Sequence, residues 1–211
     1  TKAREIAYNT LPTSIKPSIG LKSGPNLQFF KSLELCSDDG YTLLNEVDMI
    51  PIVPFWQEAC NSAIDASPDS LIIGSTYKGQ STLGKDISSH INGNALYATH
   101  DKYFREIALP RLQQDLSLYS LVDPTIAYDT FIAKMAHMSQ NKNQPNFIDP
   151  VWYGALAERI KPTNTIQNFG GKEDILSTTQ IIRLKLETNA ALIHSRASLE
   201  NLISHISGDY A

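Results

Sequence analysis

Two carboxylates lie close together in the run LLNEVDMIPI at residues 43–52, where a single valine separates Glu46 from Asp48. Divalent cations such as Mg²⁺ and Mn²⁺ prefer carboxylate oxygens and can bind the oxygens of a diphosphate at the same time. We expect a turn after Asn45 that lets the acids meet a ligand, with Asp48 as the better metal ligand. The competing interpretation is that the pair merely caps a turn.

The composition sets the broad class of the protein. The chain has 211 residues, 42% hydrophobic and 19% charged, which is ordinary for a globular protein with a sizeable core. Its formal net charge of -4 argues against a nucleic-acid partner. No apolar run approaches the roughly 18 to 20 residues of a membrane-spanning helix, and the polar start is not a signal peptide. We therefore expect one cytoplasmic domain, 1–211, whose ending GDYA fits a domain cut from a longer protein.

Short apolar runs alternate with amphipathic stretches, which indicates an α/β layered domain. Strands are expected over 5–12, 17–24, 70–77, 90–98 and the apolar residues before Glu46. Helices are expected over 25–35, 55–66, 100–121 with a break near Pro110, 125–140, and after a strand within 191–207. The acids would then follow a central strand, where open α/β sheets bind ligands. Cys36 and Cys60 lack metal-site spacing and are expected to be reduced, buried thiols.

The acidic run, with Pro51, Pro54 and Trp56 after it, resembles the glycosyltransferases of the GT-A fold, whose D-x-D or E-x-D motif is often followed by Pro and Trp. The resemblance implies a mixed central sheet flanked by helices. It also implies metal-dependent transfer from a nucleoside-diphosphate sugar, most commonly a UDP-sugar. Asp48 would bind Mn²⁺ or Mg²⁺, and Glu46 would orient the site or contact the donor sugar.

Three further segments resemble the family in the same order along the chain. HINGNALY (90–97) is similar to a polar loop of the sugar pocket, AYDTF (127–131) to the helix start that carries the base of inverting members, and ALIHSRA (191–197) to the strand end that closes the metal site. The resemblance gives the base role to Asp129, a metal-ligand role to His194 and a diphosphate contact to Arg196. The exposed pocket residues would be His90, Asn92, Gly93 and Asn94.

Each of these residues also has a purely structural interpretation. His90 would be a satisfied loop histidine, and Gly93 would serve a positive φ in a turn. Asp129 would be a first-turn carboxylate favoured by the helix dipole, and Arg196 an ordinary exposed arginine. The remaining histidines are given no ligand role: His100, His137 and His205.

The amino-terminal part matches the family less well. SGPNLQFF (23–30) resembles its helix after a Gly/Asn turn, so Lys22, Gly24 and Asn26 would approach the donor nucleotide. The end of the first strand would be matched by Thr10, Leu11 and Pro12, but the acidic residue that commonly reads the base has no counterpart.

The whole sequence also resembles the amino-terminal glycosyltransferase domain found in a type of chlorella-virus protein. Proteins of this type glycosylate the major capsid protein of the virus. We therefore expect a glycan acceptor, on a viral capsid glycoprotein in the host cytoplasm. Two alternatives stay open. One is another metal-dependent nucleotide-processing enzyme, such as a nucleotidyltransferase or phosphohydrolase, and the other is a non-catalytic carbohydrate-binding module of the same fold.

Overall fold

The structure is a computed structural model that describes residues 21–36, 40–78, 87, 90–139, 148–169 and 175–203. Its helical elements are α1 (Ser23–Leu35), α2 (Trp56–Asp65), the π-helical η3 (Phe104–Ala108), α3 (Leu109–Tyr119), α4 (Tyr128–Met138), α5 (Pro150–Glu158), α6 (Thr178–Thr188) and the 3-10 helix η4 (Arg196–Ser198). Its strands are β1 (Thr42–Leu44), β2 (Met49–Pro51), β3 (Ile72–Thr76), β4 (Ile91–Tyr97), β5 (Ile160–Pro162), β6 (Ile166–Asn168) and β7 (Leu192–His194).

The described strands form two small mixed sheets. The first has the order β1-β4-β3-β5, with β4 antiparallel to both of its neighbours and β5 parallel to β3. The second has the order β2-β7-β6, with β2 antiparallel and β6 parallel to β7. A parallel bridge between Tyr77 and Asn168 joins the end of β3 to β6, so the two sheets meet there.

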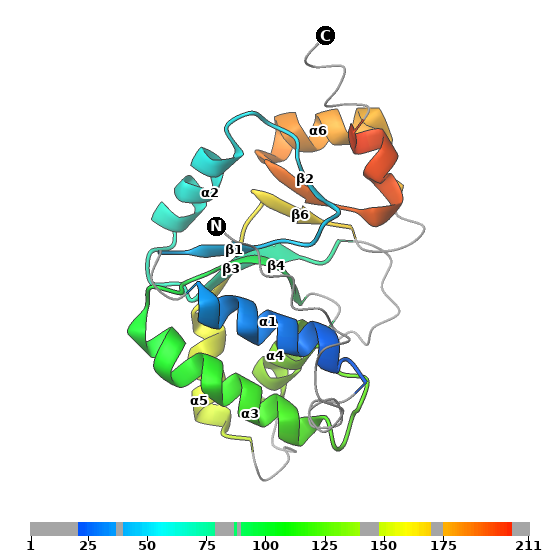
Figure 1. The fold of residues 1–211 in the computed structure, drawn as a ribbon. Coiled ribbons are helices and arrows are strands. Elements are labelled where there is room, and N and C mark those ends of the chain that lie inside the picture. Colours follow the sequence, from blue (N-terminus) through cyan, green and yellow to red (C-terminus); the bar gives the residue numbers. More distant parts are fainter. Residues whose placement is uncertain are drawn as a thin grey trace.

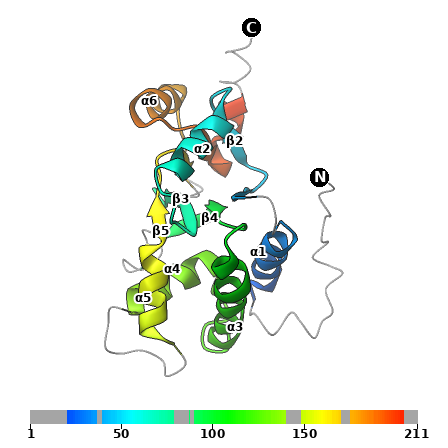
Figure 2. The ribbon, with the colours of Figure 1, turned by 90° about the vertical axis from the view of Figure 1, so that its left-hand side faces the viewer.

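Helices cover the four-stranded sheet on one side, and the second sheet lies on the other. Figure 1 shows α1, α3, α4 and α5 below the sheet, whereas α2, α6 and the strands of the second sheet lie above it. The side view in Figure 2 separates these layers again. Adjacent residues of β3 face opposite layers. Ile72 packs in the cluster with the lower helices, whereas Ile73 packs on the other side with Met49, Cys60 and Leu192. The period-2 alternation of a strand thus supplies both cores.

The helix that leads into α3 widens just before Pro110. Pro110 has no N–H and its ring would crowd the carbonyl one turn earlier in a regular helix. The chain forms a π-helical turn over Phe104–Ala108 instead, in which the N–H of Leu109 bonds to the carbonyl of Phe104. The helix does not break at Pro110, contrary to expectation, because a π-helical turn just before the proline lets it continue into α3.

The α/β class is confirmed, and so are the helix over 55–66 and the strands over 70–77 and 90–98. The expected single central sheet is instead two sheets, and β1 is an edge strand of the first, so the acids do not follow a central strand. The three residues of β1 are only half-buried, which fits an edge position.

Two boundaries also differ from the sequence-based expectation. Residues 21–24, expected in a strand, form a turn and the start of α1. The helix expected from Thr125 begins at Tyr128, because the Asp123 carboxylate accepts hydrogen bonds from the N–H and hydroxyl of Thr125 and holds a turn there.

Some expectations lie outside the described residues: the strand over 5–12 with Thr10, Leu11 and Pro12, and His205. Among the helices of the described segments, none combines the length and the apolar character that crossing a bilayer requires.

Candidate metal centre

A turn between two short strands carries the acidic pair. Residues 47 and 48 form this turn between β1 and β2, and the N–H of Met49 donates to the Glu46 carbonyl over 3.0 Å. The expected turn after Asn45 is thus confirmed. The next strand then aligns Met49 opposite His194 in the antiparallel pairing of β2 with β7. Strand register therefore brings a histidine from late in the chain beside the acidic turn.

Glu46, Asp48 and His194 converge on one point. The Nε2 atom of His194 lies 2.9 Å from Oε2 of Glu46 and 3.2 Å from Oδ1 of Asp48. One ligand atom from each of the three residues lies within 4.8 Å of the others. The side chain of Glu46 is largely exposed, at 62%, whereas the side chains of Asp48 and His194 are 15% and 8% exposed. Solvent and ligands would therefore reach a cation at this point from the side of Glu46.

Asn168 fixes the orientation of the His194 ring. The Nδ1 atom of His194 lies 2.6 Å from the Oδ1 atom of Asn168, its neighbour in the β6–β7 pairing. A carboxamide oxygen only accepts hydrogen bonds, so Nδ1 carries the proton. In the neutral imidazole, the lone pair then belongs to Nε2, which faces the two carboxylates. This is the arrangement in which a second residue prepares a histidine for metal binding.

The two carboxylates also change the protonation of the histidine. Burial by itself would lower the pKa of His194, but the hydrogen bonds and negative charges of Glu46 and Asp48 outweigh it and raise the pKa. The hydrogen bond with His194 in turn lowers the pKa of Glu46, against a smaller opposing effect of burial. A proton and a divalent cation would therefore compete for Nε2 of His194.

Asn94 holds the acidic turn in place. Its Oδ1 accepts the backbone N–H of Glu46 over 2.7 Å, and its Nδ2 lies 3.4 Å from Oε2 of Glu46. The Oδ1 atom of Asn92 accepts from both the backbone N–H and the Nδ2 group of Asn94. These two asparagines therefore position Glu46 from the neighbouring strand β4.

A cavity of about 660 Å³ opens beside the acidic turn. Strand β4 contributes Gly93 and Asn94, and α1 contributes Pro25, Gln28 and Phe29. Arg196, an exposed residue at the start of η4, adds a positive charge to the wall. The complete lining is Pro25, Gln28, Phe29, Leu44, Asn45, Glu46, Val47, Asp48, Gly93, Asn94, Tyr128, Arg196 and Leu199.

The residues expected to approach a nucleotide from the start of α1 do not line this cavity. Asn26 is fully buried, where its side chain donates to the carbonyl of Ile126 and accepts from the N–H of Tyr128. It therefore attaches α1 to the start of α4. Gly24 is buried, and Lys22 is exposed outside the lining. The lining residues from this helix are Pro25, Gln28 and Phe29.

The HINGNALY segment contains β4, as expected, but His90, Gly93 and Asn94 are buried and Asn92 is half-buried, which corrects the exposure that the resemblance implied. His90 is 6% and Asn94 is 1% exposed, because α4 and the second sheet cover the two faces of β4. Gly93 does not have a positive φ, so the turn interpretation of this glycine is wrong as well. Asn92 supports Asn94 without lining the cavity.

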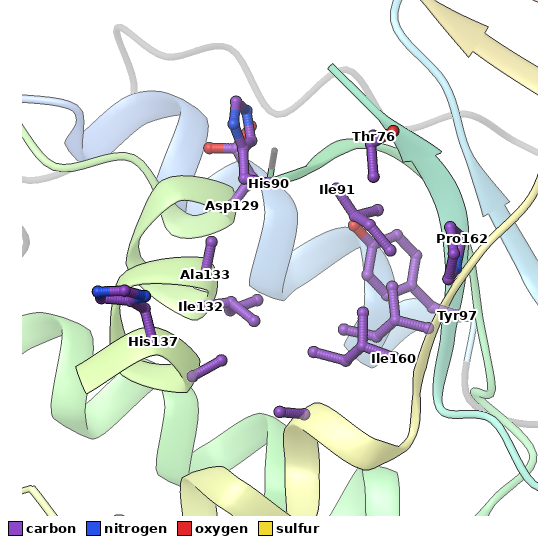
Figure 3. Close-up of a pocket in the computed structure, with 13 residues that line it drawn as sticks. Thr76, His90, Ile91, Tyr97, Asp129, Ile132, Ala133, His137, Ile160 and Pro162 are labelled. Carbon is purple, nitrogen blue, oxygen red and sulfur yellow. The ribbon is translucent and has the colours of Figure 1, made fainter. Parts of the chain in front are cut away.

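Asp129 lies in the first turn of α4, as expected, but it lines a second cavity. Its Oδ2 atom is 3.6 Å from Nε2 of His90. Figure 3 shows this pair at one end of the second cavity, which shares no lining residue with the first. The adjacent residue Tyr128 lines the first cavity, so the start of α4 stands between the two.

Among the described residues, the remaining histidines and cysteines take no part in the metal centre. His100 packs beside Tyr41, and the exposed His137 is on the wall of the second cavity. Cys36 and Cys60 are free, and burial raises the pKa of the Cys60 thiol to about 11. Cys36 is only half-buried, contrary to expectation.

Sequence patterns did not single out Asn168 or Tyr128. Asn168 lies in a three-residue strand, and only the pairing of β6 with β7 places it beside His194. Tyr128 immediately precedes Asp129, but its role depends on the close approach of α4 to β4. Neither the placement of Asn168 beside His194 nor that of Tyr128 beside β4 can be recognised from a local pattern in the sequence.

Comparisons with protein-family models, with curated proteins and with solved structures found no match to this chain.

Proposed function

We propose that the chain is a metal-dependent glycosyltransferase of the GT-A type, which transfers a sugar from a nucleoside-diphosphate sugar to a glycan. The observation that carries the proposal is the convergence of Glu46, Asp48 and His194 beside a cavity of about 660 Å³. Two of these three residues lie in the E-x-D run whose resemblance implied the same chemistry. A UDP-sugar is the proposed donor.

The three side chains fit a divalent cation. Two carboxylates and one neutral imidazole suit Mn²⁺, and the carboxylates also suit Mg²⁺. The proton on Nδ1 of His194, directed at Asn168, leaves Nε2 available as a ligand atom. A cation held there would supply positive charge to a departing diphosphate.

Other residues of the chain suit the donor. The guanidinium of Arg196 is well matched to phosphate oxygens, which it can bind in pairs. The volume of about 660 Å³ lies within the range of roughly 300 to 1,000 Å³ that is usual for ligand pockets. The stacked rings of Phe29 and Tyr128, with centroids 3.8 Å apart, form an apolar part of the wall. Asn94 keeps Glu46 in position for contact with the metal or the sugar.

Asp129 is the candidate base if the transfer inverts configuration. The acceptor oxygen would form a bond to the anomeric carbon while the bond from that carbon to the diphosphate oxygen breaks, and the hydroxyl proton would pass to Asp129. Because Asp129 lines the second cavity, which shares no lining residue with the first, this role requires an acceptor hydroxyl that reaches both Asp129 and the donor past the start of α4. The resemblance to the virus glycosyltransferase domain is the basis for proposing a capsid-protein glycan, in the host cytoplasm, as the acceptor.

The test is a screen of UDP-sugars for release of UDP in the presence of Mn²⁺ or Mg²⁺. We expect slow hydrolysis of one donor that requires the cation. Asp48→Asn should abolish both the hydrolysis and the calorimetric binding of Mn²⁺. The matched control Asp65→Asn, at an exposed carboxylate of α2, should change neither.

The same measurements separate the alternatives. A nucleotidyltransferase or phosphohydrolase would consume nucleoside triphosphates or phosphate esters in place of sugar nucleotides. A carbohydrate-binding module would bind a glycan with no dependence on Asp48. Unchanged Mn²⁺ binding in the folded Asp48→Asn protein would refute the assignment.

A further inference from the structure

The second cavity lies between the four-stranded sheet and two helices. Its volume is about 320 Å³, and its walls come from β3, β4 and β5 on one side and from α4 and α5 on the other. Figure 3 shows side chains from these elements around a common space. The complete lining is Ile72, Thr76, His90, Ile91, Tyr97, Asp129, Ile132, Ala133, Ala136, His137, Ala157, Ile160 and Pro162.

Most of this wall is apolar. Four isoleucines from β3, β4, α4 and β5 contribute branched side chains, and three alanines on the helices leave the space open: Ala133, Ala136 and Ala157. An apolar cavity of about 150 Å³ in another protein is sufficient for benzene. A space of about 320 Å³ therefore suits a ring or a short branched chain with one substituent.

One end of the cavity is polar. His90 and Asp129 have side chains only 5% and 14% exposed, and their Nε2 and Oδ2 atoms are 3.6 Å apart. This distance exceeds the 2.7 to 3.2 Å or so of a good N–H···O hydrogen bond. The Nδ1 atom of His90 is 2.8 Å from the carbonyl of Ile87, which accepts its proton. Only Nε2 is thus directed at Asp129.

The two groups offer complementary partners to a third group. The carboxylate of Asp129 accepts a hydrogen bond, and His90, when protonated, donates one. A hydroxyl group both donates and accepts, so it can satisfy both partners at once. An ammonium group would be repelled by protonated His90, and a second carboxylate by Asp129. With His90 protonated, the pair therefore favours an uncharged hydroxyl head.

We propose that the second cavity binds a small uncharged hydroxyl compound, with its apolar body among the isoleucines and its hydroxyl group between His90 and Asp129. As a binding site, this is independent of the metal centre. If the compound is also the acceptor of the glycosyl transfer, which rests on the proposed function, then the acceptor carries an apolar substituent next to its reacting hydroxyl.

Benzyl alcohol and benzyl methyl ether are suitable probes, because the ether keeps the ring and the oxygen but cannot donate a hydrogen bond. Titrations followed by methyl NMR should shift the signals of Ala133, Ala136 and Ile132. Benzyl alcohol should bind about threefold to tenfold more tightly than the ether, which corresponds to one net hydrogen bond. In Asp129→Asn this preference should shrink.

A matched pair of leucine substitutions on α5 tests the location. Ala157 lines the cavity, whereas Ala155 is an exposed residue of the same helix. Ala157→Leu should fill the space and weaken benzyl alcohol binding by about tenfold or more, while Ala155→Leu should leave it unchanged. Both variants replace one good helix former by another, so both should fold.

These titrations contain no metal ion and no sugar nucleotide, so their outcome is separate from that of the donor screen. Absence of methyl shifts in the wild-type protein, or equal binding by both leucine variants, would overturn the proposal. Equal affinities for the alcohol and the ether would refute the role of the His90–Asp129 pair.

Discussion

The phenol group of Tyr128 fills the space beside Gly93 in which the β-carbon of any other residue would have to lie. The ring of Tyr128 is held by its stacking on Phe29, and the carbonyl of Gly93 accepts a hydrogen bond from the Tyr97 hydroxyl over 3.1 Å. The start of α4 can therefore approach β4 closely only because residue 93 has no side chain. This contact lies at the first cavity, and the next residue of α4, Asp129, lines the second.

Gly93→Ala should lower the free energy of unfolding by about 1 to 3 kcal/mol, the usual cost of overpacking. Urea unfolding measures this change. The control is Gly154→Ala in α5, where a β-carbon would meet only the Ser139 hydroxyl at 3.9 Å; we expect it to be neutral or stabilising. In a Tyr128→Ala background, Gly93→Ala should lower the free energy of unfolding much less. An equal loss in both backgrounds would contradict the contact between Tyr128 and Gly93.

Asn168→Leu should weaken Mn²⁺ binding by about 10- to 100-fold, because the His194 ring would lose the acceptor that fixes its Nδ1 proton. Electron paramagnetic resonance of free Mn²⁺ gives the affinity. Asn61→Leu, at an exposed position of α2, is the matched control and should bind the ion normally. Wild-type affinity in folded Asn168→Leu would show that Asn168 does not prepare the ligand.

The His90–Asp129 pair should make stability depend on pH. Burial lowers the pKa of His90, but the Asp129 carboxylate, helped by the Ile87 carbonyl, outweighs it and raises the pKa above the ordinary value of 6.5. The folded protein therefore binds this proton more tightly than the unfolded chain. The stabilisation is complete below about pH 6.5 and is lost as the pH rises through the folded pKa. In the part of the chain that the structure describes, the ring of Tyr77 stacks on the His90 ring, with the two ring centroids 5.9 Å apart.

Asp129→Asn should remove this dependence. The difference in unfolding free energy between wild type and Asp129→Asn should shrink between about pH 6 and pH 8.5, and NMR titration should show a lower pKa of His90 in the variant. The exposed-site control, Asp65→Asn, should differ from wild type by a constant amount. A difference for Asp129→Asn that grows with pH would have the wrong sign.

Asn26→Ala should destabilise the protein by about 1 to 3 kcal/mol, since it leaves the buried Tyr128 N–H and Ile126 carbonyl without their side-chain partner. Chemical denaturation reports the loss. Gln28→Ala, at an exposed position of the same helix, should change stability by less than about 0.5 kcal/mol. Similar losses in both variants would mean that helix propensity, rather than the attachment of α1 to α4, explains the effect.

Local patterns in the sequence predicted the elements better than their arrangement. The apolar run around Ile72 and Ile73 identified a buried strand, because a strand covered on both faces needs apolar residues at every position. The same run does not reveal its neighbours, and β1 was placed at the centre of a sheet although it is an edge strand. Pairing over long sequence distances decides this, and it leaves little trace in a three-residue strand.

The site was predictable to the extent that its residues lie in recognisable runs. Asp48 and His194 were expected to act together, and the register of β2 against β7 brings them to 3.2 Å. Asp129 was expected near the same centre, yet it faces His90 across another cavity. On a helix, neighbouring residues point about 100° apart, so the rotational setting of α4 about its axis decides whether Tyr128 or Asp129 faces the metal centre.

The pairing of β2 with β7 means that the metal centre connects two segments from near opposite ends of the described chain. Each of these strands has only three residues, so few backbone hydrogen bonds hold them together. A cation coordinated by Glu46, Asp48 and His194 would act as a reversible cross-link that closes a very long loop, and such a cross-link removes much conformational entropy from the unfolded chain. Amide protons of β7 should then exchange with solvent more slowly as the cation concentration rises.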